Sequence, residues 1–255
     1  MPKSGIIFIL AALFLGAAAV AGRAQESLGA RLMMDRVGDI QTGSYTAGDN
    51  VRFALTRYAE NYLLRLDGDP EVYVLYAGPG SLGGRTLKFD SGGTAIAISG
   101  WGGMTIYTDA QPGGLPTDRT GEALLPVLPP VPLTAVEEAA RDEGNHIAYV
   151  RGIKLTFVAD WPALAADAAL RALTFDAIQN TARGIDRFTA NARARAAIAA
   201  KMDTVQMVSG GRPTIALHGK TLVVTFVPEH GFAGRASSHG IARALGQMLS
   251  IPTPG

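Results

Sequence analysis

Hydrophobic and polar residues alternate in short runs through the first half of the chain. Alternation with a period of two, as in Ala95-Ile96-Ala97-Ile98, is typical of a strand with one buried face. Glycine, aspartate and proline separate the runs by only a few residues, which suits tight turns and leaves no room for the crossovers of a parallel sheet. The pattern therefore predicts an antiparallel meander. Its strands are expected at Val51–Tyr58, Tyr62–Leu66, Val72–Tyr76, Thr86–Phe89, Thr94–Ser99 and Met104–Thr108.

The segments on either side of this meander differ from it in composition. Residues 25–50 are mostly polar and interrupted by glycines, so we expect a lead-in segment there. Six prolines from Pro112 to Pro132 favour an extended connector over 117–133. We therefore expect a β-rich meander over 51–116 and a second region over 134–255, which either stands alone or packs with the meander as one domain.

Helical signals dominate the second region. Thr134 and Glu137 have the spacing of a capping box and Gly144 is a suitable left-handed stop, so we expect a helix over 135–143. A long alanine-rich helical region follows, with a break expected at Gly184.

The remaining patterns of the second region are mixed. Asp160 is expected to cap a helix, and Ser237 or Ser238 to cap a last one in which Ile241 and Leu245 share a face. The predicted fold class is therefore α+β, with an antiparallel β-meander in the first half and mixed helix and strand in the second. Strands of the second half are expected at 153–158, 204–208 and 221–227.

The N-terminal residues have the pattern of a secretory signal peptide. Lys3 precedes an apolar run from Ile6 to Val20, and small residues follow through Ala24. The run is shorter than the roughly 18 to 20 residues that span a bilayer, so cleavage after Ala21 or Ala24 is favoured over a retained anchor. We therefore expect residues 1–24 to be removed and the protein to be periplasmic or secreted.

Composition limits the chemistry that the chain can carry. Its 255 residues contain no cysteine, which excludes disulfides, thiolate nucleophiles, cysteine-ligated zinc and a lipid-modified cysteine. The formal net charge of +1 gives no reason to expect a nucleic acid as partner. We expect no cofactor and no metal, a ligand or protein of the cell envelope as partner, and contact with the membrane only through the signal peptide before its cleavage.

Two short motifs resemble known sites. Gly78-Pro79-Gly80-Ser81-Leu82-Gly83 matches a dinucleotide fingerprint, but a strand resumes at Arg85 where a helix would have to begin, so we interpret the motif as a hairpin loop. Asp90-Ser91-Gly92 has the residue order with which β-rich aspartic proteases place a carboxylate on a turn. Because there is one copy, a homodimer would have to supply the second Asp90, and the same residues are also ordinary turn residues.

A histidine-containing neighbourhood lies near the C-terminus. Glu229, His230 and His239 carry groups that can bind a metal or act as acid and base, and Ser237 and Ser238 stand just before His239. The helical zinc motif H-E-x-x-H and the serine nucleophile elbow are both absent. A turn followed by a helix cap explains the same residues without chemistry.

Two other features are candidate binding surfaces. Trp101, on a glycine-rich hairpin, can stack on sugars or on a partner surface, or fold back into the core. A basic stretch in the long helical region is interpreted as a solvated helix face, because acids such as Asp186 dilute it. Its members are Arg183, Arg187, Arg193 and Arg195.

The residues Gly102-Gly103-Met104-Thr105-Ile106-Tyr107-Thr108, followed by Pro112, Gly114 and Pro116, carry a family resemblance. They resemble the hairpin-and-loop signature of exported proteobacterial proteins catalogued as a domain of unknown function, family 4908. The resemblance covers mainly residues 51–116. It implies a bacterial, periplasmic protein and carries over no catalytic residue.

Taken together, these patterns favour a non-enzymatic periplasmic binding or envelope-associated module, because no complete catalytic constellation is present. The alternative is a periplasmic hydrolase that uses Glu229, His230 and His239, or a dimeric pair of Asp90 carboxylates.

Overall fold

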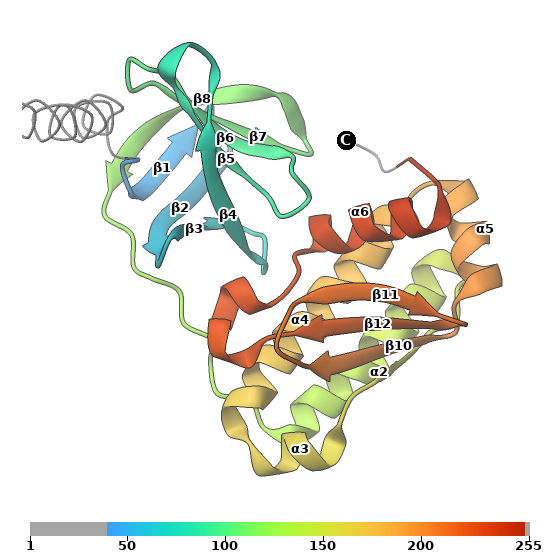
Figure 1. Cartoon of the computed structure of the whole chain (residues 1–255). Coiled ribbons are helices and arrows are strands. Elements are labelled where there is room, and N and C mark those ends of the chain that lie inside the picture. The colour runs from blue at the N-terminus through green and yellow to red at the C-terminus, as the bar shows by residue number, and fades with distance from the viewer. Residues whose placement is uncertain (1–39, 253–255) are drawn as a thin grey trace, which may run out of the picture.

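Eight antiparallel strands form a closed barrel in the first half of the computed structural model, which describes residues 40–252 (Figure 1). Each strand pairs with the next one along the chain, as the meander prediction requires, and β1 pairs with β8 to close the barrel. The strands are β1 (Gly43–Ala47), β2 (Val51–Tyr58), β3 (Asn61–Leu66), β4 (Val72–Pro79), β5 (Arg85–Lys88), β6 (Thr94–Ile98), β7 (Met104–Thr108) and β8 (Gln111–Gly121), with a short 3-10 turn η1 (Ser81–Gly83) between β4 and β5.

The two strands that close the barrel are absent from the six predicted ones. β1 lies inside 25–50, where we expected a lead-in, and β8 runs past residue 116 into the expected connector. β1 has only five residues, and β8 contains two prolines and three glycines, which obscure the alternation on which the prediction rests. The predicted signal peptide, 1–24, lies outside the residues that the structure describes.

The barrel interior is a packed apolar core. Leu55, Leu75, Leu87 and Ile96 are fully buried inside it, and the Tyr45 ring stacks on another core ring. Small barrels are filled by inward side chains in this way, so they leave no channel. A ligand site must therefore lie at the barrel ends or outside the barrel.

Residues 122–132 connect the barrel to a layered helix and sheet unit, which we call the α/β unit, over residues 133–252. In its four-stranded sheet, β10 is parallel to β9 and β12, whereas β11 is antiparallel to β12, so the sheet is mixed. This agrees with the predicted α+β class, although β11 was missed. The elements are α2 (Leu133–Arg151), β9 (Thr156–Val158), α3 (Trp161–Ala166), α4 (Ala168–Phe188), α5 (Ala192–Lys201), β10 (Thr204–Ser209), β11 (Thr214–His218), β12 (Thr221–Phe226), η2 (Pro228–Gly234) and α6 (Ser238–Leu249).

The predicted ends of the first helix of this unit are wrong. α2 begins after Pro132 with no side-chain cap, so Thr134 does not form the predicted capping box. Gly144 lies inside the helix, where a Cβ would stand 2.7 Å from the Leu155 carbonyl oxygen. The glycine therefore permits close packing, and the left-handed stop is Gly152.

The other two capping predictions are confirmed. Asp160 accepts the backbone N–H of Ala163 at the start of α3, and the Ser237 hydroxyl accepts that of Gly240 at the start of α6. The predicted face of α6 is buried through Ile241, Leu245 and Leu249.

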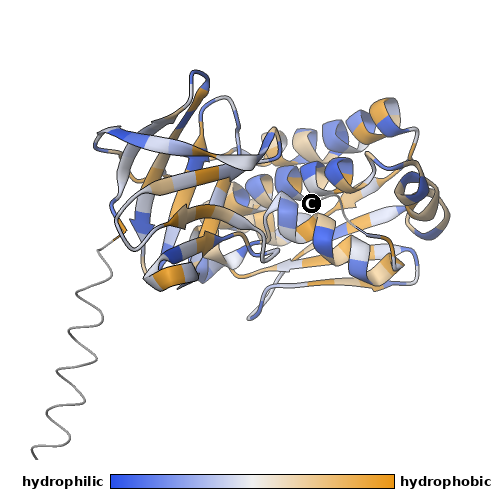
Figure 2. Ribbon diagram, turned by 90° about the horizontal axis from the view of Figure 1, so that it is seen from above, coloured by the Kyte–Doolittle hydropathy of each residue, from blue (hydrophilic) through white to orange (hydrophobic). Residues whose placement is uncertain are grey.

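Hydrophilic and hydrophobic residues alternate along the helices of this unit (Figure 2). No helix within residues 40–252 combines the length and the apolar character needed to cross a membrane.

Candidate functional site

Two carboxylates of the barrel bind the first turn of α6. Glu71 Oε1 accepts the backbone N–H of Ser238 at 2.8 Å. Asp90 Oδ2 accepts the N–H of Ser237 at 2.8 Å, and Oδ1 accepts the Ser237 hydroxyl at 2.5 Å. The first N–H groups of a helix have no partner inside the helix and carry partial positive charge, so they favour carboxylate acceptors. These contacts fix α6 against one end of the barrel.

A second contact fixes the α/β unit to the outside of β3 and β4. Phe232 of η2 packs with Leu63, Val72 and Val74 in one buried cluster. The buried Arg235 donates to the Val72 carbonyl oxygen at 2.8 Å and pairs with Asp176 of α4. The two units are therefore joined by apolar packing as well as by polar contacts.

A cleft of two adjoining cavities lies beside the first of these contacts, where loops of the barrel face α4 and α6. The larger cavity, of about 600 Å³, is enclosed by barrel loops on one side and by α4 and α6 on the other. The smaller cavity, of about 330 Å³, extends toward α2. Both are lined by Asp69, Tyr73, Asp109 and Arg187.

The larger cavity has an aromatic and apolar wall. Phe89, Tyr107 and Leu66 come from the barrel, and Ala242 comes from α6. His239 stacks on Phe89 with ring centroids 4.1 Å apart. Burial, together with the nearby positive charge of Arg187, lowers the pKa of His239 to about 4. The imidazole is therefore neutral at pH 7 and serves as part of the aromatic wall.

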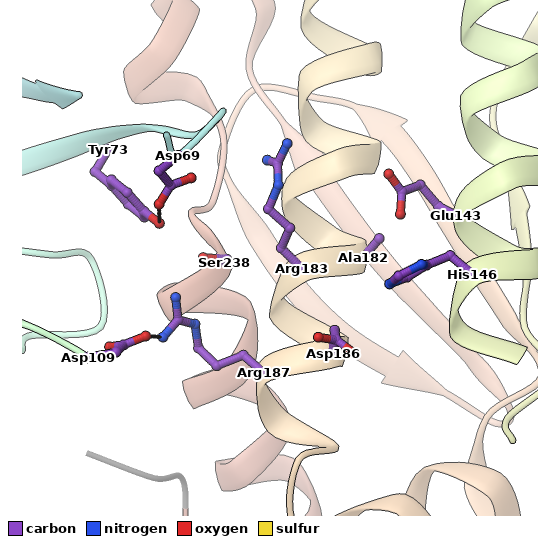
Figure 3. Close-up of a pocket in the computed structure, with 10 residues that line it drawn as sticks. All are labelled: Asp69, Tyr73, Asp109, Glu143, His146, Ala182, Arg183, Asp186, Arg187 and Ser238. Atoms are coloured by element: carbon purple, nitrogen blue, oxygen red, sulfur yellow. Dashed lines mark hydrogen bonds and ion pairs between the residues drawn. The ribbon is translucent and has the colours of Figure 1, made fainter. Parts of the chain in front are cut away.

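The smaller cavity is dominated by charged side chains from α2, from α4 and from two turns of the barrel (Figure 3). Several of them are already paired internally. Arg187 pairs with Asp109, and Arg151 outside the cavity donates to Asp186 at 2.6 Å. These pairs account for three of the six charged side chains that line the cavity.

Three charged groups of the smaller cavity lack an oppositely charged partner among the described residues. Arg183 donates only to two side-chain amide oxygens of its own helix, at 2.7 and 3.2 Å. Asp69 accepts from neutral donors, the Tyr73 hydroxyl at 2.7 Å and the Glu71 backbone N–H at 2.9 Å. Glu143 faces the cavity from α2, on the far side of Arg183 from Asp69 (Figure 3), and burial raises its pKa.

A fully buried carboxyl lies behind this wall. Glu71 has no exposed surface, and burial raises its pKa to about 7, against the lowering effect of the adjacent Ser238 and of the charge of Arg235. Its Oε2 and the Ser238 hydroxyl have no hydrogen-bond partner within the described part of the chain. Ser238 also lines the smaller cavity.

The structure separates the residues that the sequence grouped as candidate chemistry. Glu229 and His230 are exposed on η2 and line neither cavity, whereas His239 lines the larger one. In the part of the chain that the structure describes, no group of three or more histidine, aspartate or glutamate residues could hold a metal ion. The Asp90 carboxylate, which the protease hypothesis pairs with a second Asp90, here accepts the backbone N–H of Ser237 at the first turn of α6. A catalytic role for these four residues stays a prediction.

The two glycine-rich candidates are hairpin tips. Trp101 is 98% exposed in the turn between β6 and β7, so it does not fold back into the core. Gly78 to Gly83 join β4 to β5 through η1, as a hairpin loop requires. Binding by Trp101 stays a prediction.

Sequence reasoning missed the main residues of the cleft and the buried carboxyl behind its wall. Asp69 and Glu71 stand in a turn after β3, where polar residues are ordinary, and no local pattern distinguishes them. Arg183 and Arg187 were noted, but as a solvated face. Their spacing of four residues on one helix was the available signal, since it places both on the same face.

A family model described as "Domain of unknown function (DUF4908)" matches residues 26–245, which is well over half of the chain. Among curated proteins and among solved structures, none matches the chain.

Proposed function

We propose that this chain, which belongs to the DUF4908 family of domains of unknown function, is an exported binding protein. Its ligand would be a small zwitterion with an apolar side group, of the class of amino acids and short peptides. The ligand occupies the cleft between the barrel and the α/β unit. Export rests on the predicted signal peptide in residues 1–24.

The single observation that carries the proposal is the set of unpaired charges in the smaller cavity. Arg183 offers a guanidinium whose present partners are neutral amides. Asp69 and Glu143 offer carboxyl groups on either side of it. A ligand that carries both a carboxylate and an ammonium group pairs with both kinds of side chain, whereas a ligand with one charge leaves some of them unmatched.

The larger cavity supports the apolar part of the ligand. It adjoins the charged cavity through Asp69, Tyr73 and Arg187, so one molecule reaches both. Its volume of about 600 Å³ is within the usual range for small-molecule sites, and its rings at Phe89 and Tyr107 suit an aliphatic or aromatic side group.

We favour binding over the hydrolase alternative for two reasons. Glu229 and His230, the candidate acid and base of that alternative, line neither cavity. His239 does line the cleft, but its lowered pKa, about 4, makes it a poor proton acceptor at neutral pH.

Calorimetry with matched probes tests the proposal. The probes are phenylalanine and the dipeptide Phe-Leu, compared with phenethylamine and 3-phenylpropionate, which keep the ring but only one charge each. We expect at least one zwitterion to bind about tenfold more tightly than either single-charge analogue, because one charge-assisted contact is lost in each analogue.

Substitution of the cleft arginine separates specific from nonspecific binding. Arg183→Met should weaken binding of the zwitterion by about tenfold or more, whereas Arg193→Met, at an exposed position of α5, should leave it unchanged. The proposal is wrong if none of the zwitterions binds, or if Arg183→Met binds as well as the original chain.

Mass spectrometry of the processed protein tests export. We expect an N-terminus at Gly22 or Gln25.

A further inference from the structure

Two neighbouring hairpin tips of the barrel carry large apolar side chains that touch solvent only. Leu82 in η1 is 99% exposed, and Trp101 in the turn between β6 and β7 is 98% exposed. The tips are adjacent because β5 pairs with both β4 and β6, and because Gly100 packs so closely that a Cβ there would stand 3.0 Å from the Leu82 carbonyl oxygen. We call Leu82 and Trp101 the apolar tip.

The apolar tip is at the barrel end opposite the cleft. The loops after β3, β5 and β7 line the larger cavity, and in an antiparallel meander the loops after β4 and β6 must lie at the other end. A partner bound at the tip therefore leaves the cleft open.

The N-terminal segment joins the barrel at this same end. β1 begins at Gly43, opposite Leu55, and β2 continues from Leu55 to Tyr58 and the turn before β3, so the start of β1 is directed toward this end. The residues before β1 include the apolar run Ile6–Val20, so the segment that the export prediction places in the membrane is joined to the barrel at this end.

We propose that the apolar tip inserts into the surface of a lipid bilayer. Tryptophan favours the boundary between headgroups and acyl chains, because its ring is apolar and its indole N–H stays hydrated. Leu82 adds a purely apolar side chain beside it, so the two together bind weakly and reversibly, as shallow insertion does. This contact is additional to the signal peptide, the one membrane contact that the sequence analysis expects, and it does not depend on the proposed ligand.

The fluorescence of Trp101 tests the insertion. The protein is used in the form that the expressing bacterium produces, with or without cleavage of residues 1–24. The chain has two tryptophans, so Trp161→Phe leaves Trp101 as the sole emitter. With vesicles of phosphatidylethanolamine and phosphatidylglycerol, we expect a blue shift of the emission and quenching by lipids brominated on the acyl chain. Quenching reports the tip itself, so the result holds whether or not residues 1–24 have been removed.

Vesicle pelleting with variants provides the matched control. Leu82→Ser combined with Trp101→Ala should lower the bound fraction of the cleaved protein on the order of tenfold, since both apolar contacts are lost. Leu124→Ser, which removes an apolar side chain 90% exposed on the connector, should change nothing. The proposal is overturned if vesicles neither shift nor quench Trp101, or if soluble oligosaccharides shift it and vesicles do not.

Discussion

At the scale of single residues, the least ordinary group is the carboxyl of Glu71. It is fully buried, and one of its oxygens caps the first turn of α6 through the N–H of Ser238. Desolvation penalises its charged form more than these contacts favour it, which is why its pKa rises to about 7. The stability of the protein should therefore depend on pH through this residue.

The sign of this dependence follows from the proton that Glu71 holds. Between pH 4.5 and 7 the folded chain keeps this proton, whereas the unfolded chain releases it, so rising pH destabilises the fold. In Glu71→Gln this contribution to the unfolding free energy is absent, because glutamine does not titrate. We expect the unfolding free energy of the original chain, measured relative to that of Glu71→Gln, to fall by up to about 3 kcal/mol from pH 4.5 to pH 7.

Urea unfolding at several pH values measures this difference. His239 has the opposite dependence, because its lowered pKa costs stability as pH falls from 6.5 toward 4, but it is present in both proteins and cancels. Glu60→Gln, which removes a carboxyl group whose side chain is 95% exposed, is the control. A difference for Glu71→Gln that does not fall as pH rises would contradict the prediction.

At the scale of elements, the approach of α4 to α6 holds the α/β wall of the cleft together. Gly184 was expected to break the helical region, yet α4 continues through it. A Cβ at this position would stand 2.4 Å from the Cβ of Ile241 and 2.8 Å from the Ser238 carbonyl oxygen. The glycine is therefore where the two helices touch, and packing compensates its low helix propensity.

Gly184→Ala should destabilise the protein by about 1 to 3 kcal/mol, because the added methyl group forces the two helices apart. This sign is the reverse of the gain of about 1 kcal/mol that alanine brings inside a helix without such a contact. The midpoint and slope of urea denaturation give the value. Gly211→Ala, where a Cβ meets nothing within 4 Å, should stay within about 0.5 kcal/mol of the original chain. An equally stable or more stable Gly184→Ala would refute the close contact.

At the scale of the whole molecule, two folded units share one interface, and the cleft is built from both. The connector 122–132 is a single chain segment without helix or strand. Contacts at Asp90, Glu71 and Arg235 therefore hold the units together independently of the peptide link.

Cleavage of the connector tests this independence. With a specific protease site placed within 122–132, the two fragments of the cut protein should elute together in size-exclusion chromatography. Asp90→Ala should raise their dissociation constant by about tenfold, because the contacts of a charged acceptor with α6 are lost. Asp118→Ala, at an exposed position of β8, should have no effect. Fragments that separate as soon as the original chain is cut would show that the interface needs the connector.

The sequence alone was sufficient for the local features of this fold. Six of the eight barrel strands, the caps at Asp160 and Ser237 and the buried face of α6 follow from residue period and from hydrogen bonds within a few residues. The family resemblance, drawn from one hairpin and its loop, is confirmed by the match over residues 26–245.

Tertiary structure alone decided the rest. β1 and β8 are strands because each pairs with the other across the closed barrel, and neither has a strong pattern of its own. Glu71 and Ser238 are 167 residues apart in the chain, and Asp109 and Arg187 are 78 apart. Local patterns report only on neighbouring residues, whereas the charges and rings of the cleft come from loops and helices that meet when the two units dock.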